Sequence, residues 1–146
     1  MRIDALQPVI AARLATISRD APFLDAARVF GAGTFRMLIV CEDGGRAVGI
    51  ITRTDAMRHI GESDNPLAAV IGELMVTKLT SALPADDLLV TWRMMTGAGL
   101  NHVPVLDQLG TPLGILTADD ALKALLEAEE YEEHLLSDYV AGIGYR

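Results

Sequence analysis

Two copies of one short motif place threonine and aspartate at a spacing that can bind a sugar phosphate. Residues 49–55 read G-I-I-T-R-T-D and residues 114–120 read G-I-L-T-A-D-D, at an offset of 65 positions. Each motif reads as the end of a strand followed by the start of a helix, where free N–H groups and a partial positive charge of about half a unit suit an anion. The threonine hydroxyl adds a donor, the glycine leaves room for close approach, and the aspartate can accept hydrogen bonds from two neighbouring ribose hydroxyls. The candidate pairs are Thr52 with Asp55 and Thr117 with Asp120.

The same spacing is also that of a helix capping box. In a capping box the threonine hydroxyl accepts from an N–H three residues on, and the acidic side chain accepts from the threonine's own N–H. A single copy of the motif favours this structural interpretation. A second copy does not remove it, because a duplicated fold duplicates its caps. The surrounding residues must therefore decide between a ligand site and two caps.

The motif belongs to a longer duplication without gaps, and such a repeat determines the architecture. Leu24 and Val40, for example, recur 65 positions later as Leu89 and Val105. Each repeat predicts a strand, a helix, a strand, a tight turn, a strand and a second helix. The predicted elements are residues 14–17, 20–30, 36–42, 43–46, 47–51 and 53 to about 60 in the first repeat, and 79–82, 86–96, 102–106, 107–110, 113–116 and 118 to about 136 in the second.

The connecting segments and the last helix complete this outline. Residues 61–66 are polar and predict a loop, and residues 67–75 predict a short helix. In the last helix, Leu122, Leu125 and Leu126 are spaced to form its inner face.

Composition excludes several classes of protein. The chain has 146 residues and a net charge of −8, which argues against a surface for nucleic acid. Its longest apolar runs are far shorter than the ~18 residues that span a bilayer, and Arg2, Asp4 and Arg13 interrupt any secretory signal, so we expect a cytoplasmic protein. Cys41 lies in an apolar run and should be a packed thiol. The sequence has no nucleophile elbow, phosphate-binding loop or metal-ligand cluster, and so does not predict an enzyme.

The sequence resembles the tandem cystathionine beta-synthase (CBS) domain pair, also called the Bateman module. The resemblance rests on both motifs, on the strand start L-N-H-V-P-V at residues 100–105, on the lead-in E-L-M-V-T at residues 73–77 and on the helix start L-P-A-D-D at residues 83–87. It covers roughly residues 14–126, and residues 131–142 are similar to the C-terminal extension of small stand-alone pairs. It implies an α/β (α+β) fold in which two pseudo-symmetric β-α-β-β-α repeats pack sheet to sheet.

The resemblance also implies a regulatory module with two clefts for adenosine-containing ligands, such as AMP, ADP, ATP, NAD or S-adenosylmethionine. No cofactor would be tightly required, and Mg²⁺ is compatible with a phosphorylated ligand. Asp55 and Asp120 would hold ribose hydroxyls, and Thr52 and Thr117 would lie near the ribose or the first phosphate. The adenine would lie against Leu38 and Ile39 in the first repeat and against His102, Val103 and Pro104 in the second, near the short strands at Thr16 and Ser81.

Two positions inside the motifs make the clefts unequal. Stand-alone pairs often carry an arginine immediately before the motif aspartate, but here Thr54 and Asp119 stand there, and Arg53 lies one position earlier. Asp119 repels a phosphate unless a cation intervenes. We therefore expect the first-repeat site to prefer a phosphorylated ligand more than the second does. A titration that placed the tighter AMP site at Asp120 would contradict this expectation.

The repeats, of roughly 60 residues each, would be only marginally stable alone because too little surface is buried, and they should pack on each other. The hydrophobic content of 51% further predicts a homodimer, formed through the helix at residues 86–96 with Trp92, Met94 and Met95, and through its counterpart at residues 26–30. The predicted organisation is an N-terminal helical segment (1–13), CBS repeat 1 (14–62), a linker helix (63–74), CBS repeat 2 (75–128) and an acidic C-terminal extension (129–146).

Two functions fit these observations. The first is a nucleotide-sensing protein in which an adenosine ligand changes the orientation of the repeats and thereby the affinity for an unknown regulated protein. The second is a structural dimerisation module with vestigial clefts, in which both motifs serve only as helix caps.

Overall fold

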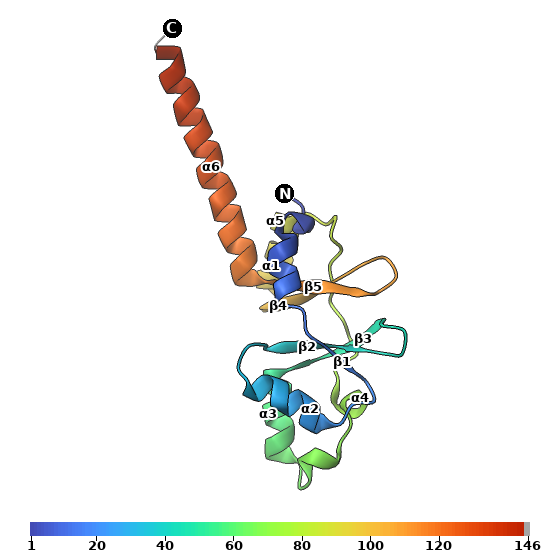
Figure 1. Ribbon diagram of the computed structural model, residues 1–146. Helices are drawn as coiled ribbons and strands as arrows, with labels where there is room; N and C mark the ends of the chain where they lie inside the picture. The colour runs from blue at the N-terminus through green and yellow to red at the C-terminus, as the bar shows by residue number, and fades with distance from the viewer. Residues whose placement is uncertain (145–146) are drawn as a thin grey trace.

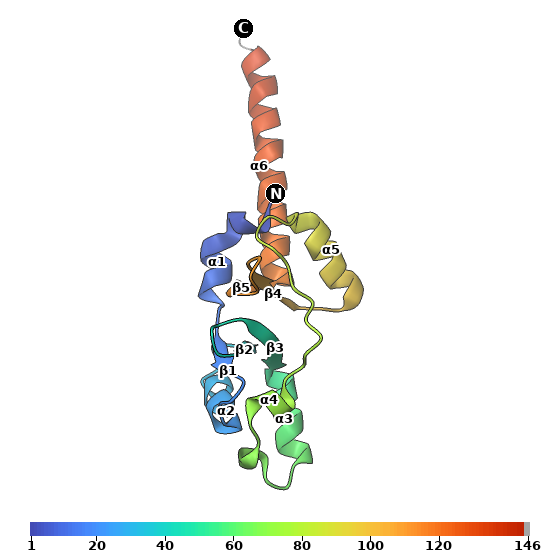
Figure 2. The ribbon, with the colours of Figure 1, turned by 90° about the vertical axis from the view of Figure 1, so that its right-hand side faces the viewer.

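Two β-sheets face each other, and helices cover their outer sides (Figure 1). In this computed structural model the backbone is described for residues 1–144 and the side chains for residues 1–134. Figure 2 shows the layers in order: α1, α5 and α6, then the two-stranded sheet, then the three-stranded sheet, then α2 and α3. The elements are η1 (Ile3–Leu6), α1 (Gln7–Ala12), β1 (Thr16–Ser18), α2 (Phe23–Gly31), β2 (Met37–Cys41), β3 (Ala47–Thr52), α3 (Arg53–Glu62), η2 (Pro66–Ala68), α4 (Ile71–Leu74), α5 (Leu88–Ala98), β4 (His102–Leu106), β5 (Pro112–Thr117) and α6 (Ala118–Gly144).

The predicted fold class is confirmed, since the two repeats do pack sheet to sheet. In the first repeat β1 is parallel to β2 and β2 is antiparallel to β3. In the second repeat β4 and β5 form the corresponding hairpin. Residues 37–40 of β2 are all buried, because one face of this strand meets the helices and the other meets the opposite sheet. A cluster formed by Met37, Ile39, Ala47, Leu106 and Ile115 joins the two sheets.

The strand predicted at residues 79–82 does not form, and a proline explains why. Only Ala82 pairs with the sheet, through a parallel bridge to Val105. In the first repeat the ladder continues because Ile39 donates its N–H to the carbonyl of Ala15 at 2.9 Å. Pro104 occupies the position that corresponds to Ile39 and has no N–H to donate. The second repeat therefore has a two-stranded sheet where the first has three strands.

Other predicted boundaries also move for local reasons. The helix predicted from residue 20 begins at Phe23, because the residue before Pro22 is biased away from the helical region. The short helix predicted at residues 67–75, within the linker at residues 63–74, is two short pieces, η2 and α4, separated by extended backbone at Ala69 and Val70. The carbonyl of Ala69 there accepts the N–H of Phe23 at 2.9 Å, so this break ties the linker to the first repeat.

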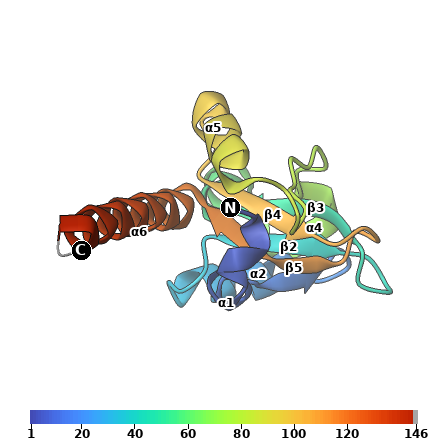
Figure 3. The ribbon, with the colours of Figure 1, turned by 90° about the horizontal axis from the view of Figure 1, so that it is seen from above.

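The last helix is longer than predicted and turns a different face inward. It runs to Gly144 and extends away from the body of the protein (Figures 1 and 3). Ala121 is buried, and Leu125 is partly buried against the second-repeat core. The prediction of Leu122 and Leu126 as inner residues is wrong, because they are 38% and 50% exposed. The predicted C-terminal extension includes residues 135–146, whose side chains lie outside the described residues.

The segment that precedes each repeat packs on the other repeat. Ile3, Leu6 and Ile10 belong to the core of the second repeat, and α1 lies beside β5 (Figure 2). Ile71, in turn, belongs to the core of the first repeat. Both crossings depend on the motif glycines. A Cβ at Gly49 would lie 2.9 Å from the carbonyl oxygen of Val76, and one at Gly114 would lie 2.5 Å from that of Ile10.

Candidate functional site

A cleft of about 470 Å³ lies beside the first motif, and we call it the first-repeat cleft. The N-terminal end of α3 contributes Thr52, Arg53 and Thr54 to its lining. The segment before β4 supplies the opposite wall, so this cleft lies between the repeats. The remaining lining residues are Arg36, Met37, Ile50, Gly99, Leu100, Asn101 and His102.

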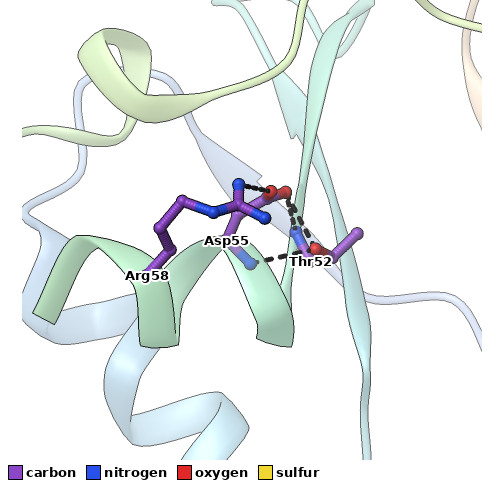
Figure 4. Close-up of polar contacts among 3 residues, drawn as sticks. All are labelled: Thr52, Asp55 and Arg58. Carbon is purple, nitrogen blue, oxygen red and sulfur yellow. Dashed lines mark hydrogen bonds and ion pairs between the residues drawn. The ribbon is translucent and has the colours of Figure 1, made fainter. Parts of the chain in front are cut away.

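The first motif forms a complete capping box (Figure 4). The Asp55 N–H donates to the Thr52 hydroxyl at 3.2 Å, and the Asp55 carboxylate accepts from the Thr52 N–H at 3.0 Å and from its hydroxyl at 2.8 Å. Arg58, one turn further along α3, contacts the other carboxylate oxygen at 3.4 Å. The Asp55 side chain is 19% exposed and is absent from the lining of the cleft. The structural interpretation of this motif is therefore realised, with its carboxylate occupied by neighbours.

Two adjoining pockets of about 510 and 500 Å³ lie on the other side of the same inter-repeat space, and together we call them the second-repeat cleft. Arg13, Thr34, Arg36 and His102 line both of them. Thr117, Ala118 and Asp119, at the start of α6, line one of them. Pro8, Val9 and Ala12 of α1, with Phe35, Met37 and Ile115, line the other.

The second motif differs from the first in the partner of its aspartate. The Asp120 N–H donates to the Thr117 hydroxyl at 3.0 Å, as in a cap. The carboxylate, however, is held by the guanidinium of Arg13 through both oxygens, Nη2 lying 3.0 Å from Oδ1 and Nε also in contact. This pair, with a smaller contribution from Thr117, holds the pKa of Asp120 below its usual value. Arg13 follows directly after α1, so the N-terminal segment provides a charged group for the second motif.

Arg36 and His102 lie where the two clefts meet, since both residues line all three pockets. Burial lowers the pKa of His102, and the positive charges of Arg13 and Arg36 lower it further. Three arginines, Arg13, Arg36 and Arg53, thus line the continuous space between the repeats. Such a space is electrostatically suited to an anionic group.

The structure does not bring the rest of the predicted adenine wall to the cleft. The side chains of Leu38, Ile39 and Val103 are 1%, 0% and 0% exposed and belong to the cores. Pro104 is also buried. Thr16 and Ser81 are exposed, and neither is among the residues that line the two clefts. Of the predicted wall, only His102 lines the clefts.

The sequence interpretation missed Arg13 and Arg36. Neither belongs to the repeated motif. Arg13 reaches its cleft because α1 packs against the second repeat, whereas Arg36 directly precedes β2, and its carbonyl accepts the N–H of Arg53 at 2.9 Å. One signal was present, because Lys78 lies 65 positions after Arg13 and gives each repeat a basic residue shortly before its first strand.

The remaining predictions concern the thiol of Cys41, metal binding and membrane-spanning segments. Cys41 is half-buried, and burial raises the pKa of its thiol. The described residues contain no group of three His, Cys, Asp or Glu side chains that could hold a metal ion. Within the same residues, every helix falls short of the length or the apolar character needed to cross a bilayer.

Comparison with known proteins agrees with this architecture. A relative named L-aspartate semialdehyde sulfurtransferase, from Methanosarcina acetivorans, is 27% identical over 123 residues, which are 84% of this chain and 24% of the relative. The chain thus spans about a quarter of that protein.

Solved structures show the same fold. The CBS domain pair of protein MJ0100, in complex with 5′-methylthioadenosine and S-adenosyl-L-methionine, has a TM-score of 0.71 at 19% identity, over 88% of this chain and 98% of the other. CBSX2 in complex with AMP has a TM-score of 0.73 at 20% identity, over 88% and 98% of the two chains. The sequence model of the CBS domain matches residues 4–62 and 71–127. The protein therefore belongs to the CBS domain family and carries two CBS domains as a tandem pair.

Proposed function

We propose that this protein is a regulatory module that binds an adenosine-containing ligand between its two repeats. The observation that carries the proposal is the first-repeat cleft, where the N-terminal end of α3, which includes Arg53, lies beside Arg36. Its volume of about 470 Å³ lies in the range of small-molecule sites. The ligands in the related structures, AMP in one and S-adenosyl-L-methionine with 5′-methylthioadenosine in the other, indicate the class of compound.

The proposed mechanism is a shift in the orientation of the two sheets. A ligand in the cleft contacts both repeats, so it stabilises the relative arrangement that it binds best. That arrangement then changes the affinity for a regulated protein, which this chain does not identify. We propose no catalytic role, and Thr52 and Asp55 act in this scheme as ligand-binding residues that also cap α3.

Direct binding tests the proposal. AMP, ATP, NAD and S-adenosylmethionine are titrated by calorimetry, and the melting temperature is followed in parallel, since a ligand of the native state raises it. Arg53→Gln should weaken AMP binding about fivefold, the effect of losing one exposed charge contact. Arg19→Gln, which removes another exposed arginine, is the matched control. The absence of binding by all four ligands would overturn the proposal.

The alternative function is a structural module with vestigial clefts. The completed capping box at Thr52 and the occupied carboxylate of Asp120 favour it, because neither aspartate is available without rearrangement. The double variant Asp55→Ala with Asp120→Ala separates the two. A large loss of stability in a protein that shows no ligand response supports the structural function, whereas a lost ligand response with little loss of stability supports the regulatory one.

We also propose that two copies associate through α5. Leu89, Val90 and Met94 are exposed on this helix, with Val90 at 65%. The counterpart that the sequence suggested, residues 26–30, does not offer the same face, because Ala26 and Phe30 are buried in the first-repeat core. Met95 is likewise buried, in the second-repeat core.

A further inference from the structure

The Arg13–Asp120 pair gives the second-repeat cleft a property that the motif alone does not have. Arg13 comes from the N-terminal segment, and Asp120 lies 107 residues further along the chain. The carboxylate engages the guanidinium through both oxygens, which is the most favourable geometry for such a pair. An adenosine ligand whose ribose hydroxyls donated hydrogen bonds to the Asp120 carboxylate would have to displace the Arg13 guanidinium from it. The inference that follows rests on the proposed function, the binding of an adenosine ligand between the repeats.

Arg13 also stands between the cleft and the carboxylate. The Asp120 side chain is 16% exposed and does not line the cleft, whereas Arg13 is 47% exposed and lines both of its pockets. A ligand entering this cleft therefore meets the cation before the carboxylate. The first-repeat cleft differs, because Asp55 is held by Arg58 of its own helix, and Arg58 does not line that cleft.

We propose that the second-repeat cleft selects phosphorylated adenosine ligands by an exchange of partners at Arg13. The ribose hydroxyls take the Asp120 carboxylate, and the phosphate of the same ligand becomes the new partner of Arg13. Adenosine offers no group that can replace the carboxylate, so the guanidinium loses its hydrogen-bonded partner and only the more distant charge of Asp119 remains near it. S-adenosylmethionine carries a carboxylate, but its sulfonium and ammonium groups give it a net positive charge beside the same guanidinium, and this repulsion disfavours it.

This selectivity differs from the expectation drawn from Asp119 alone. Asp119 does line the cleft, but Arg13 and Arg36 line the same pocket and oppose its charge. The ranking of affinities is unchanged: AMP should bind the second-repeat cleft more weakly than the first, because the Arg13–Asp120 pair engages both carboxylate oxygens, whereas Arg58 contacts a single oxygen of Asp55 at 3.4 Å. What Arg13 adds is a preference of the second-repeat cleft for a phosphorylated ligand over adenosine.

Site-resolved titration tests the exchange. Amide chemical shifts of Arg53 and Thr54 report on the first-repeat cleft, and those of Thr117 and Ala118 on the second. The probes are adenosine, AMP and S-adenosylmethionine, added to the full chain. In the wild type, AMP should shift both sets of amides. The affinity of adenosine, fitted from the second set of amides, should be at least about fivefold lower than that of AMP, which corresponds to about 1 kcal/mol of binding free energy.

Arg13→Gln should remove the preference of the second-repeat cleft for AMP over adenosine. Adenosine should then bind the second-repeat cleft about fivefold more tightly than in the wild type and AMP more weakly, while the first set of amides responds as before. Arg2→Gln is the matched control, since Arg2 is also in the N-terminal segment and pairs with an exposed carboxylate, that of Asp4. Arg13→Lys, which retains the cation, should keep a preference for AMP.

The outcomes separate this inference from the proposed function. Equal affinity of adenosine and AMP at the second set of amides in the wild type overturns the exchange and leaves the proposed function standing. An unchanged ratio in Arg13→Gln does the same. If no ligand shifts either set, both proposals fail. The comparison in the wild type decides the question even if Arg13→Gln does not fold.

Discussion

Thr52 and Asp55 show how one pair of side chains can serve both a fold and a ligand. Their three hydrogen bonds complete the start of α3. Thr52→Val should therefore destabilise the protein by about 1 kcal/mol, the usual cost of losing an N-cap. Denaturant unfolding measures this, with Thr54→Val as a control, because Thr54 is exposed and lies outside the cap. Equal losses in the two variants would contradict a capping role for Thr52.

His102 predicts a dependence of stability on pH. Its pKa is lowered in the folded protein, first by burial and then by Arg13 and Arg36, while Asp119 and Asp120 act in the opposite direction. Because the pKa is lowered, the unfolded chain takes up a proton more readily than the folded protein does. The contribution of His102 to the free energy of unfolding is therefore complete above the unfolded-state pKa of about 6.5 and is lost as the pH falls below it.

The titration of the imidazole carbon shifts by nuclear magnetic resonance measures this pKa directly. We expect a midpoint below that of a histidine in a denatured control, and a steeper loss of stability on acidification than in His102→Gln. An unshifted midpoint would contradict the burial of the ring between the clefts. Binding of AMP should raise the midpoint, because the phosphate is an anion close to the ring.

The residues of the site were predictable only where a local pattern specifies them. Thr52 and Thr117 were identified because a helix start is a feature of a few consecutive residues, and both line the clefts. Arg13 was not, because its position depends on the packing of α1 against the other repeat, and Arg36 was not, because it lies outside the repeated motif although it directly precedes β2. The predicted contacts of Leu38 and Val103 with adenine are not supported, since these apolar residues fill cores.

At the level of elements, the two close crossings of the motif strands predict unequal effects of substitution. Gly114→Ala should destabilise the protein by about 1–3 kcal/mol, because its Cβ would meet the backbone of Ile10 at 2.5 Å, which cannot yield without moving α1. Gly49→Ala should cost less, since part of its conflict is with the flexible side chain of Met75.

Gly61→Ala supplies the control for these variants. Gly61 lies in α3 with open space around it, so alanine there should stabilise the helix by about 0.5–1 kcal/mol. Thermal and denaturant unfolding of the three variants gives the order. A Gly114→Ala protein as stable as the wild type would show that α1 does not pack on β5 as described.

The elements themselves were largely predictable, because their periodic patterns are local. The strand at residues 102–106 was predicted with the observed bounds, and the hairpin of the first repeat was predicted to within one residue at each end. The failure at residues 79–82 arose because the missing N–H belongs to a different strand, at Pro104. The inner face of α6 was misjudged because Ala118, Ala121 and Ala124, together with Leu125, face the second-repeat core, while Leu122 and Leu126 are exposed.

For the whole molecule, the exposed face of α5 predicts self-association. Val90→Asp should weaken the proposed dimer about tenfold or more, because a charge would be placed in an apolar contact. Light scattering after gel filtration across a dilution series measures it. Leu109→Asp is the control, because Leu109 is a leucine that is 82% exposed and lies in a turn away from α5. A wild type that remains monomeric at high concentration would rule out this interface.

The packing of each preceding segment on the other repeat has a consequence for folding during synthesis on the ribosome. The residues of η1 and α1 that complete the second-repeat core are made about 100 residues before β5, against which they pack. The first repeat is likewise complete only when Ile71 fills its core and Val76 pairs with Ile50 of β3. The first repeat therefore cannot finish folding until residues 71–76 have been made, and the apolar residues of η1 and α1 stay without their packing partners until almost the entire tandem pair has been synthesised.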